Sequence, residues 1–285
     1  MKAEKKRVGI KAQVRAENER GRRVATAVFL AIILASAALS AYFGYTVLNP
    51  STPSNSVEPT LQFKPENPNL ELKAAVVDQL SLTAPNETFT QTAAAILTQA
   101  NYTVDYFSGE KVTVEFYRSL PTRGYGLIVL RVHSALFRGC DPPVCFFTSE
   151  PYSEGEYVYE QLADRVIQVS FVRLQPPYYF GIVPSFVKSN MHGKFQNTMV
   201  IMMGCNGLTY TDMAGAFIEN GAKAYIGWNN SVSSSHTDQA TTQLLKHLVT
   251  EGQTIRQAVE NTAREVGPDE TYDSILKYYP LAWGN

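Results

Sequence analysis

The chain has 285 residues, of which 45% are apolar and 18% are charged, a composition that excludes a mainly disordered protein. This length is enough for one or two domains with a sizeable hydrophobic core. The formal net charge of −1 argues against general nucleic-acid binding, so no nucleic-acid partner is expected.

Residues 1–23 form a basic leader. They contain nine lysines and arginines against three glutamates, a balance of +6, so the rest of the chain carries −7. Because positively charged flanks stay on the cytoplasmic side of a membrane, this leader is expected in the cytoplasm, lying on anionic headgroups, with binding to a cytoplasmic partner as the alternative.

An apolar segment without any charged side chain follows, over residues 24–48. A helix needs about 20 apolar residues to cross the hydrocarbon core, and Tyr42 and Tyr45 lie near the far end, where aromatic side chains favour the interface. The sequence predicts a single-pass anchor in the cell membrane, with the lipid bilayer as partner and the rest of the chain extracytoplasmic. The alternative is a cleaved signal peptide with residues 35–37 (Ala-Ser-Ala) as its cleavage site.

Residues 49–69 contain five prolines and few large apolar side chains, which is typical of a stiff, extended stalk. Residues 70–285 then form one domain of ordinary size.

Apolar runs and amphipathic segments alternate within this domain. Short continuous runs are typical of strands buried on both faces, and Asn86 is placed to cap the first helix. Such alternation predicts an α/β fold with a mostly parallel sheet and helices on both faces. The expected strands are 73–77, 103–107, 127–132, 198–203 and 222–228; the expected helices are 87–100, 212–220, 237–250 and 254–266, with a helical turn before Pro121; and a hairpin of 166–172 with 178–183 is expected in the long segment 134–197.

Two residues with nucleophilic or basic side chains directly follow expected strands. His133 comes after the strand over 127–132, and Cys205 comes one glycine after the strand over 198–203. In an open parallel sheet the reactive crevice lies beyond the carboxyl ends of the strands. A thiolate is a strong nucleophile, and a nearby imidazole can take the thiol proton. Taken singly, the cysteine could be a buried filler and the histidine structural, but their joint position favours chemistry.

The sequence resembles the caspase–gingipain–legumain superfamily of cysteine peptidases at these places. One apolar strand ends in His133 and a later one ends in Gly204-Cys205, as in that superfamily. The segment 199–265 resembles the C-terminal half of gingipain-like and CHAT-domain members, while the likeness over 73–134 is weaker. The matching positions are Gly204, Cys205, Gly221, Ala222, Gly227, Trp228, Gly252, Thr254, Ile255 and Ala258.

This resemblance implies a caspase-like domain and a cysteine endopeptidase that hydrolyses peptide or protein substrates without a cofactor. Cys205 is then the nucleophile and His133 the base, and the N–H groups of Cys205 and Ser134 form the oxyanion hole. The superfamily usually has glycine where this chain has Ser134, and it includes members without peptidase activity. A catalytically inactive module that binds or scaffolds at the cell surface is therefore the alternative.

Other residues carry secondary expectations. His236 is an alternative base, whereas His192 and His247 are expected to be structural or exposed. Asp212, Trp228 and Asn229 are candidates for the substrate pocket. Asp212 could instead cap the helix that follows it, and Trp228 could instead pack the sheet. No spacing matches a zinc site or a phosphate-binding loop, so no metal is expected.

Three cysteines allow three single disulfide pairings. Cys140 and Cys145, joined by a loop with two prolines, are the expected pair in an oxidising compartment, which leaves Cys205 free. Three glycosylation sequons begin at Asn86, Asn101 and Asn229. Glycans are expected on Asn86 and Asn101, whereas a glycan on Asn229 would crowd the substrate pocket.

Overall fold

The structure is a computed structural model that describes residues 72–137, 144–172 and 175–280. The chain divides into two compact units, residues 1–58 and 59–285, and every described residue belongs to the second. The expected leader, anchor and stalk lie outside the described residues. Among the described residues, no helix combines the length and apolarity needed to cross a membrane.

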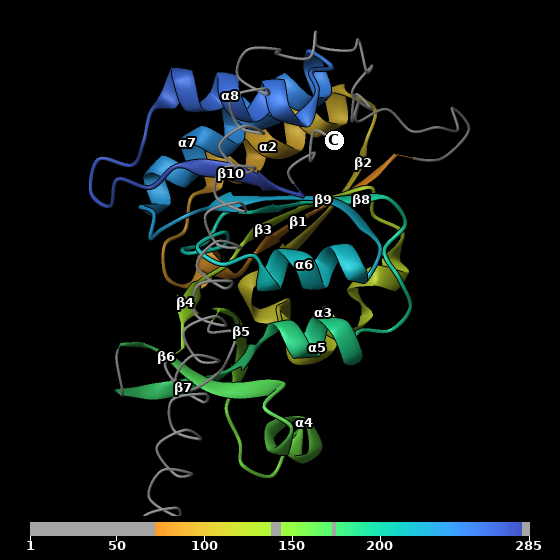
Figure 1. Cartoon of the computed structure of the whole chain (residues 1–285), viewed down its shortest axis with the longest axis vertical. Helices are drawn as coiled ribbons and strands as arrows, with labels where there is room; N and C mark the ends of the chain where they lie inside the picture. Colours follow the sequence, from red (N-terminus) through yellow and green to blue (C-terminus); the bar gives the residue numbers. More distant parts are fainter. Residues whose placement is uncertain (1–71, 138–143, 173–174, 281–285) are drawn as a thin grey trace, which may run out of the picture. The chain divides into compact units, whose positions relative to one another are not determined.

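The centre of the domain is a six-stranded sheet with strand order β10–β9–β8–β3–β1–β2 (Figure 1). Neighbouring strands run parallel except for β10, which pairs antiparallel with β9. Every residue of β3 and β8 is buried, as their continuous apolar runs predict. The predicted α/β fold with a mostly parallel sheet is confirmed. The strands are β1 Lys73–Asp78, β2 Thr103–Ser108, β3 Leu127–Arg131, β8 Thr198–Met202, β9 Ala222–Trp228 and β10 Leu276–Tyr279.

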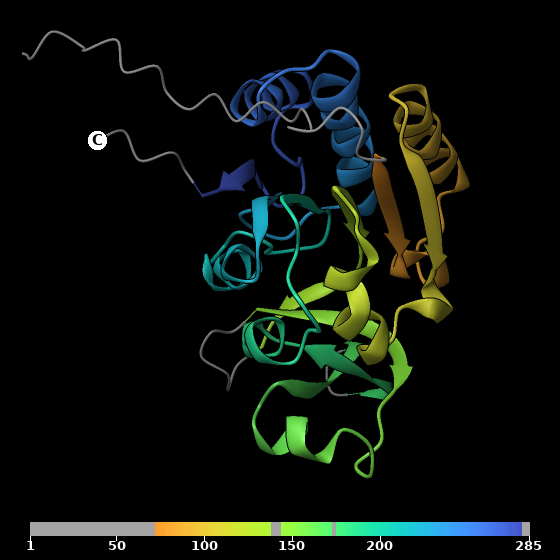
Figure 2. The same ribbon diagram turned by 90° about the vertical axis from the view of Figure 1, so that its right-hand side faces the viewer.

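Helices cover both faces of this sheet, each by burying an apolar stripe (Figures 1 and 2). On one face, here called the upper face, lie α2 Glu87–Gln99, α7 Ser234–Leu245 and α8 Ile255–Val266. On the opposite, lower face lie α3 Val114–Ser119, α5 Pro184–Ser189 and α6 Asp212–Glu219.

Capping side chains define where two of these helices begin. The Asn86 side-chain oxygen accepts the Phe89 N–H over 3.1 Å at the start of α2, as expected. Thr254 and Gln257 form a reciprocal capping box at the start of α8. Helix α7 begins at Ser234, before the expected position, and gives way to a π-helical turn over Lys246–Thr250.

A second sheet lies beside the lower face, with strand order β4–β5–β7–β6 and antiparallel pairing throughout. Its inner face packs on the lower core through Val144, Phe146, Phe180 and Ile182. The expected hairpin is present as β6 and β7, whereas β4, β5 and the separate sheet were not predicted. The elements of this region are β4 Ser134–Leu136, β5 Val144–Pro151, α4 Val158–Leu162, β6 Val166–Val172 and β7 Gln175–Ile182.

Candidate active site

His133 and Cys205 follow neighbouring strands at the carboxyl edge of the six-stranded sheet. The pairing of β3 with β8 ends with Leu130 opposite Met202. The two chains stay paired beyond that point, because the Met203 N–H donates to the Leu130 carbonyl oxygen over 2.9 Å. His133 and Cys205 therefore leave the sheet from neighbouring strands at the same edge. The Cys205 side chain packs against the core of the upper face, whereas the His133 ring packs on Phe147 and Phe171 of the second sheet.

Glycine at position 204 allows the two chains to stay this close. A Cβ atom on Gly204 would lie 2.3 Å from the Val132 carbonyl oxygen and 2.6 Å from the Ser134 hydroxyl oxygen. The Ser134 hydroxyl also donates to the Cys205 carbonyl oxygen. The segments that carry His133 and Cys205 are therefore in direct contact.

The backbone and ring of His133 are both held in place. Its N–H donates to Oε1 of Gln79 over 2.9 Å, and its Nε2 lies 2.8 Å from the Thr83 hydroxyl oxygen. The ring packs against Phe147 and Phe171, with centroid distances of 6.0 Å and 4.8 Å. These contacts orient the imidazole from the segment after β1 and from the second sheet.

Burial lowers the pKa of His133 below its ordinary value, and the positive charge of Arg131 adds to the effect. The neutral imidazole is therefore the prevailing form near pH 7. A neutral imidazole has a free lone pair and can accept a proton.

The thiol of Cys205 is half-buried and lies against the backbone of Val232, in the segment between β9 and α7. The Val232 N–H donates to Sγ over 3.5 Å, and Sγ lies 3.7 Å from the Val232 carbonyl oxygen. Within the described part of the chain no hydrogen bond joins His133 to Cys205, because the imidazole leans toward Thr83 and the thiol toward Val232. Such hydrogen bonds are often long before substrate binds.

Asp269 supports the segment that carries Val232. One of its carboxylate oxygens accepts the Ser233 N–H over 2.9 Å, and the other accepts the N–H groups of Thr271 and Tyr272. The residue is only 1% exposed, and burial acts to raise its pKa. The three N–H groups outweigh that effect and hold the pKa of Asp269 below its usual range. Asp269 is therefore ionised and fixes the backbone beside the Cys205 thiol.

Two backbone N–H groups, those of Ser134 and Cys205, belong to the segments that carry His133 and Cys205. The Phe147 N–H donates to the His133 carbonyl oxygen over 2.9 Å. Since antiparallel ladders alternate between bonded and non-bonded pairs, the Ser134–Phe146 pair is non-bonded and the Ser134 N–H points away from β5. The Cys205 N–H has no acceptor among the described residues. Both groups are therefore available to an oxyanion.

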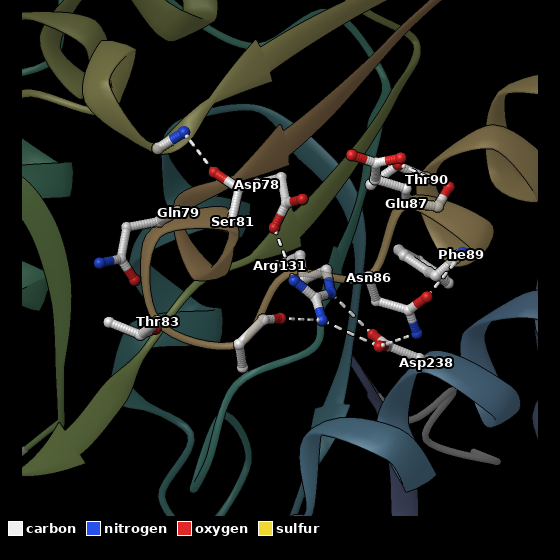
Figure 3. Close-up of polar contacts among 12 residues, drawn as sticks. Asp78, Gln79, Ser81, Thr83, Asn86, Glu87, Phe89, Thr90, Arg131 and Asp238 are labelled. Carbon is white, nitrogen blue, oxygen red and sulfur yellow. Dashed lines mark hydrogen bonds and ion pairs between the residues drawn. The ribbon is translucent and has the colours of Figure 1, made fainter.

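A buried ionic network is centred on Arg131, which lies two residues before His133 in the sequence (Figure 3). Arg131, only 1% exposed, donates from Nη1 to Asp78 over 2.8 Å and from Nε to Asp238 over 2.7 Å. Its Nη2 reaches the Ala84 carbonyl oxygen and the second oxygen of Asp238, which also accepts from Asn86. The network ties the end of β1, the end of β3 and helix α7 together. Sequence analysis did not predict it, since a charged residue in a strand gives no sign of burial.

The three candidate pocket residues occupy different parts of the domain. Asp212 is exposed in the first turn of α6, on the lower face, and Thr211 rather than Asp212 is the N-cap. Trp228 is 1% exposed, and its indole N–H donates to Thr237 over 2.9 Å. The Asn229 side chain accepts a backbone N–H from the segment before β10.

The other histidines take positions of three kinds. His236, the alternative base, lies in the first turn of α7 with its ring 5.2 Å from that of Trp228. Its Nε2 is buried and has no partner in the described ranges. His192 is exposed, and His247 is buried with Nδ1 2.8 Å from Glu251. No group of three possible metal-ligating side chains occurs among the residues that the structure describes.

The expected disulfide and glycan sites are partly described. Cys145 is buried in β5, with Sγ 3.5 Å from the Ala135 carbonyl oxygen, while Cys140 lies outside the described residues. The disulfide therefore stays a prediction. The Asn86 amide is engaged with Phe89 and Asp238, whereas Asn101 is exposed at a turn with φ of 65°. Asn101 is thus the better placed of the two for a glycan.

Comparison with models of known protein families finds no match for this chain, and none of the curated proteins matches it.

Proposed function

We propose that this chain is a membrane-anchored, extracytoplasmic cysteine endopeptidase of the caspase type, with Cys205 as nucleophile and His133 as base. One observation supports the proposal: the segments that carry His133 and Cys205 follow neighbouring strands and are in contact at the carboxyl edge of the sheet, through the Ser134 hydroxyl and Gly204. The resemblance of the segment around Gly204 and Cys205 to that superfamily supports the same reading.

The reaction follows from these positions. His133 takes the thiol proton, and the thiolate attacks the carbonyl carbon of the peptide bond. The N–H groups of Cys205 and Ser134 bind the resulting oxyanion. His133 returns the proton to the leaving amine as the carbon–nitrogen bond breaks. It then activates a water molecule, which hydrolyses the thioester and restores the thiol.

Thr83 acts in this proposal as the residue that orients the base. For Nδ1 to keep a lone pair toward the thiol, the proton of the neutral ring must lie on Nε2. The Thr83 hydroxyl oxygen, 2.8 Å from Nε2, is placed to accept that proton's hydrogen bond and so favours this tautomer. A base oriented by a third group is the usual arrangement around an activated nucleophile.

Peptide cleavage by the full-length protein in detergent micelles tests the proposal. Cys205→Ala should abolish cleavage of a peptide library and labelling by a thiol-directed peptide probe. His133→Ala should lower kcat by about 10²–10⁴-fold. His236→Ala should have a far smaller effect; an effect as large as that of Cys205→Ala would make His236 the base. Circular dichroism spectra of all variants control for folding.

The rival is a catalytically silent module that binds or scaffolds at the cell surface. A specific observation favours it: His133 and Cys205 each bond to other groups, Thr83 and Val232, rather than to one another among the described residues. If no peptide is cleaved and Cys205→Ala changes only stability, the rival is correct.

The location is part of the proposal and rests on the sequence of the first 48 residues. Protease added to whole cells should release the domain that follows the stalk. Full protection of that domain would contradict the orientation.

A further inference from the structure

The ring of His133 lies against a set of aromatic side chains from the second sheet. Its centroid is 4.8 Å from that of Phe171 and 6.0 Å from that of Phe147. Phe171 in turn lies 5.5 Å from Phe147 and 4.9 Å from Tyr179. These three side chains, from β5, β6 and β7, are here called the aromatic wall.

The aromatic wall as a whole is only partly buried by the second sheet. Phe147 belongs to a small cluster separate from the two main cores, and Phe171 and Tyr179 lie at its margin, half-buried. Val172, next in the chain, is 58% exposed. Among the described residues, the side chains that pack on the imidazole ring are aromatic. Apolar side chains pack well on such rings.

The chemistry of the proposed reaction decides which part of a substrate meets this wall. When the carbon–nitrogen bond breaks, the protonated imidazole gives its proton to the leaving amine, which becomes the new N-terminus of the released segment. The amine must therefore lie within hydrogen-bond reach of His133. The side chain on the same residue is then the one nearest to the rings that pack on the imidazole.

We propose that the aromatic wall is a binding subsite for an apolar or aromatic side chain on the residue directly after the cleaved bond. This inference rests on the proposed peptidase function and adds a substrate class to it. Aliphatic or aromatic side chains such as Leu, Met or Phe fill the subsite by packing on Phe171 and Tyr179. A carboxylate that packed on these rings would lose hydration, and the rings themselves offer it no hydrogen-bond donor or positive charge in return.

Peptides that differ only at the residue after the cleaved bond test this, with the full-length protein in detergent micelles. We expect kcat/KM for Phe or Leu to exceed that for Asp by at least about tenfold. Phe171→Ala should remove most of that preference, measured as the ratio of kcat/KM for the Phe peptide to that for the Gly peptide in the same variant, and Phe171→Leu should retain part of it. Tyr159→Ala, which removes an aromatic side chain that is 87% exposed on α4, is the matched control and should change nothing.

Three outcomes contradict the inference. Cleavage that needs Cys205 but is equally fast with Phe, Gly and Asp would contradict the proposed subsite and still support the proposed peptidase function. An undiminished preference in both Phe171→Ala and Tyr179→Ala assigns the preference to another part of the chain. Absence of any Cys205-dependent cleavage refutes both the peptidase and its subsite. Thermal unfolding of each variant shows whether a lost preference reflects a lost fold.

Discussion

The hydroxyl oxygen of Thr83 lies 2.8 Å from Nε2 of His133, across 50 residues of sequence and from an exposed position after β1. A hydrogen bond at this nitrogen influences which ring nitrogen carries the proton of the neutral imidazole, and therefore which one keeps a lone pair that can accept another proton.

Thr83→Val should lower kcat by about three- to tenfold, because one neutral hydrogen bond contributes roughly 0.5–1.5 kcal/mol. Thr83→Ser keeps a hydroxyl and should restore most of the rate. Steady-state kinetics separates this role from packing, because KM should hardly move. Equal rates for the wild type and Thr83→Val would show that Thr83 does not orient the base.

The pH dependence of cleavage should report the lowered pKa of His133. Burial and the charge of Arg131 disfavour the protonated imidazole and lower the pKa of His133. The midpoint of the acidic limb in a plot of kcat/KM against pH should therefore lie below about 6.5, the ordinary histidine pKa. The unfolded chain binds this proton more readily than the folded one. The associated stability is therefore present above about pH 6.5 and is lost as the pH falls below it. A limb above pH 6.5 would point to a different base.

Arg131→Met should reduce the free energy of unfolding by about 3–5 kcal/mol, because it leaves Asp78 and Asp238 as buried carboxylates without their cation. Lys188→Met is the matched control. The Lys188–Glu219 pair is 3.0 Å apart but exposed, so its loss should cost less than about 1 kcal/mol. Chemical denaturation measures both. Similar values for the two variants would mean that the buried network contributes no more than a surface pair.

Gly204→Ala should destabilise the domain by about 1–3 kcal/mol or more and displace Cys205, because its methyl group meets the Val132 carbonyl oxygen. Gly215→Ala is the contrast. A methyl group at Gly215, inside α6, meets no atom within 4 Å, so that change should stabilise the domain by up to about 1 kcal/mol. Melting temperatures should move in opposite directions. A neutral Gly204→Ala would mean that the two chains can separate without cost.

Helices and strands that are marked by a local sequence pattern were predicted with nearly the right bounds. Strand β9 has the expected bounds, and Asn86 caps α2 as expected, because a continuous apolar run and a capping side chain are local features. Strand β10 was missed, since its Leu-Lys-Tyr-Tyr sequence is short and partly exposed, and it is a strand because it pairs with β9. Strands β4 and β5 were missed for a similar reason, as part of a long segment without regular alternation.

In the candidate site too, some residues are indicated by a local sequence pattern and others are not. His133 and Cys205 were chosen as candidates because each lies within two residues of the end of an apolar run, and strand ends of one parallel sheet meet at one edge. The groups that support them were not recognised. Thr83 is an ordinary loop residue in sequence, and Val232 acts through its backbone, which no side-chain pattern reveals. Arg131 and Asp238 are 107 residues apart, and only the tertiary fold brings them together.

The reversed polarity of β10 gives the thiol a neighbour that a further parallel strand would not supply. A parallel strand would start at the opposite edge of the sheet, with its entry loop far from Cys205. Because β10 runs the other way, the turn that leads into it lies at the carboxyl edge, where Asp269 can hold Ser233 and, through it, Val232. Residues 267–275 therefore belong to the surroundings of the Cys205 thiol. Changes in this C-terminal turn are a route by which the reactivity of a thiol more than 60 residues earlier in the chain can be adjusted without altering the sheet.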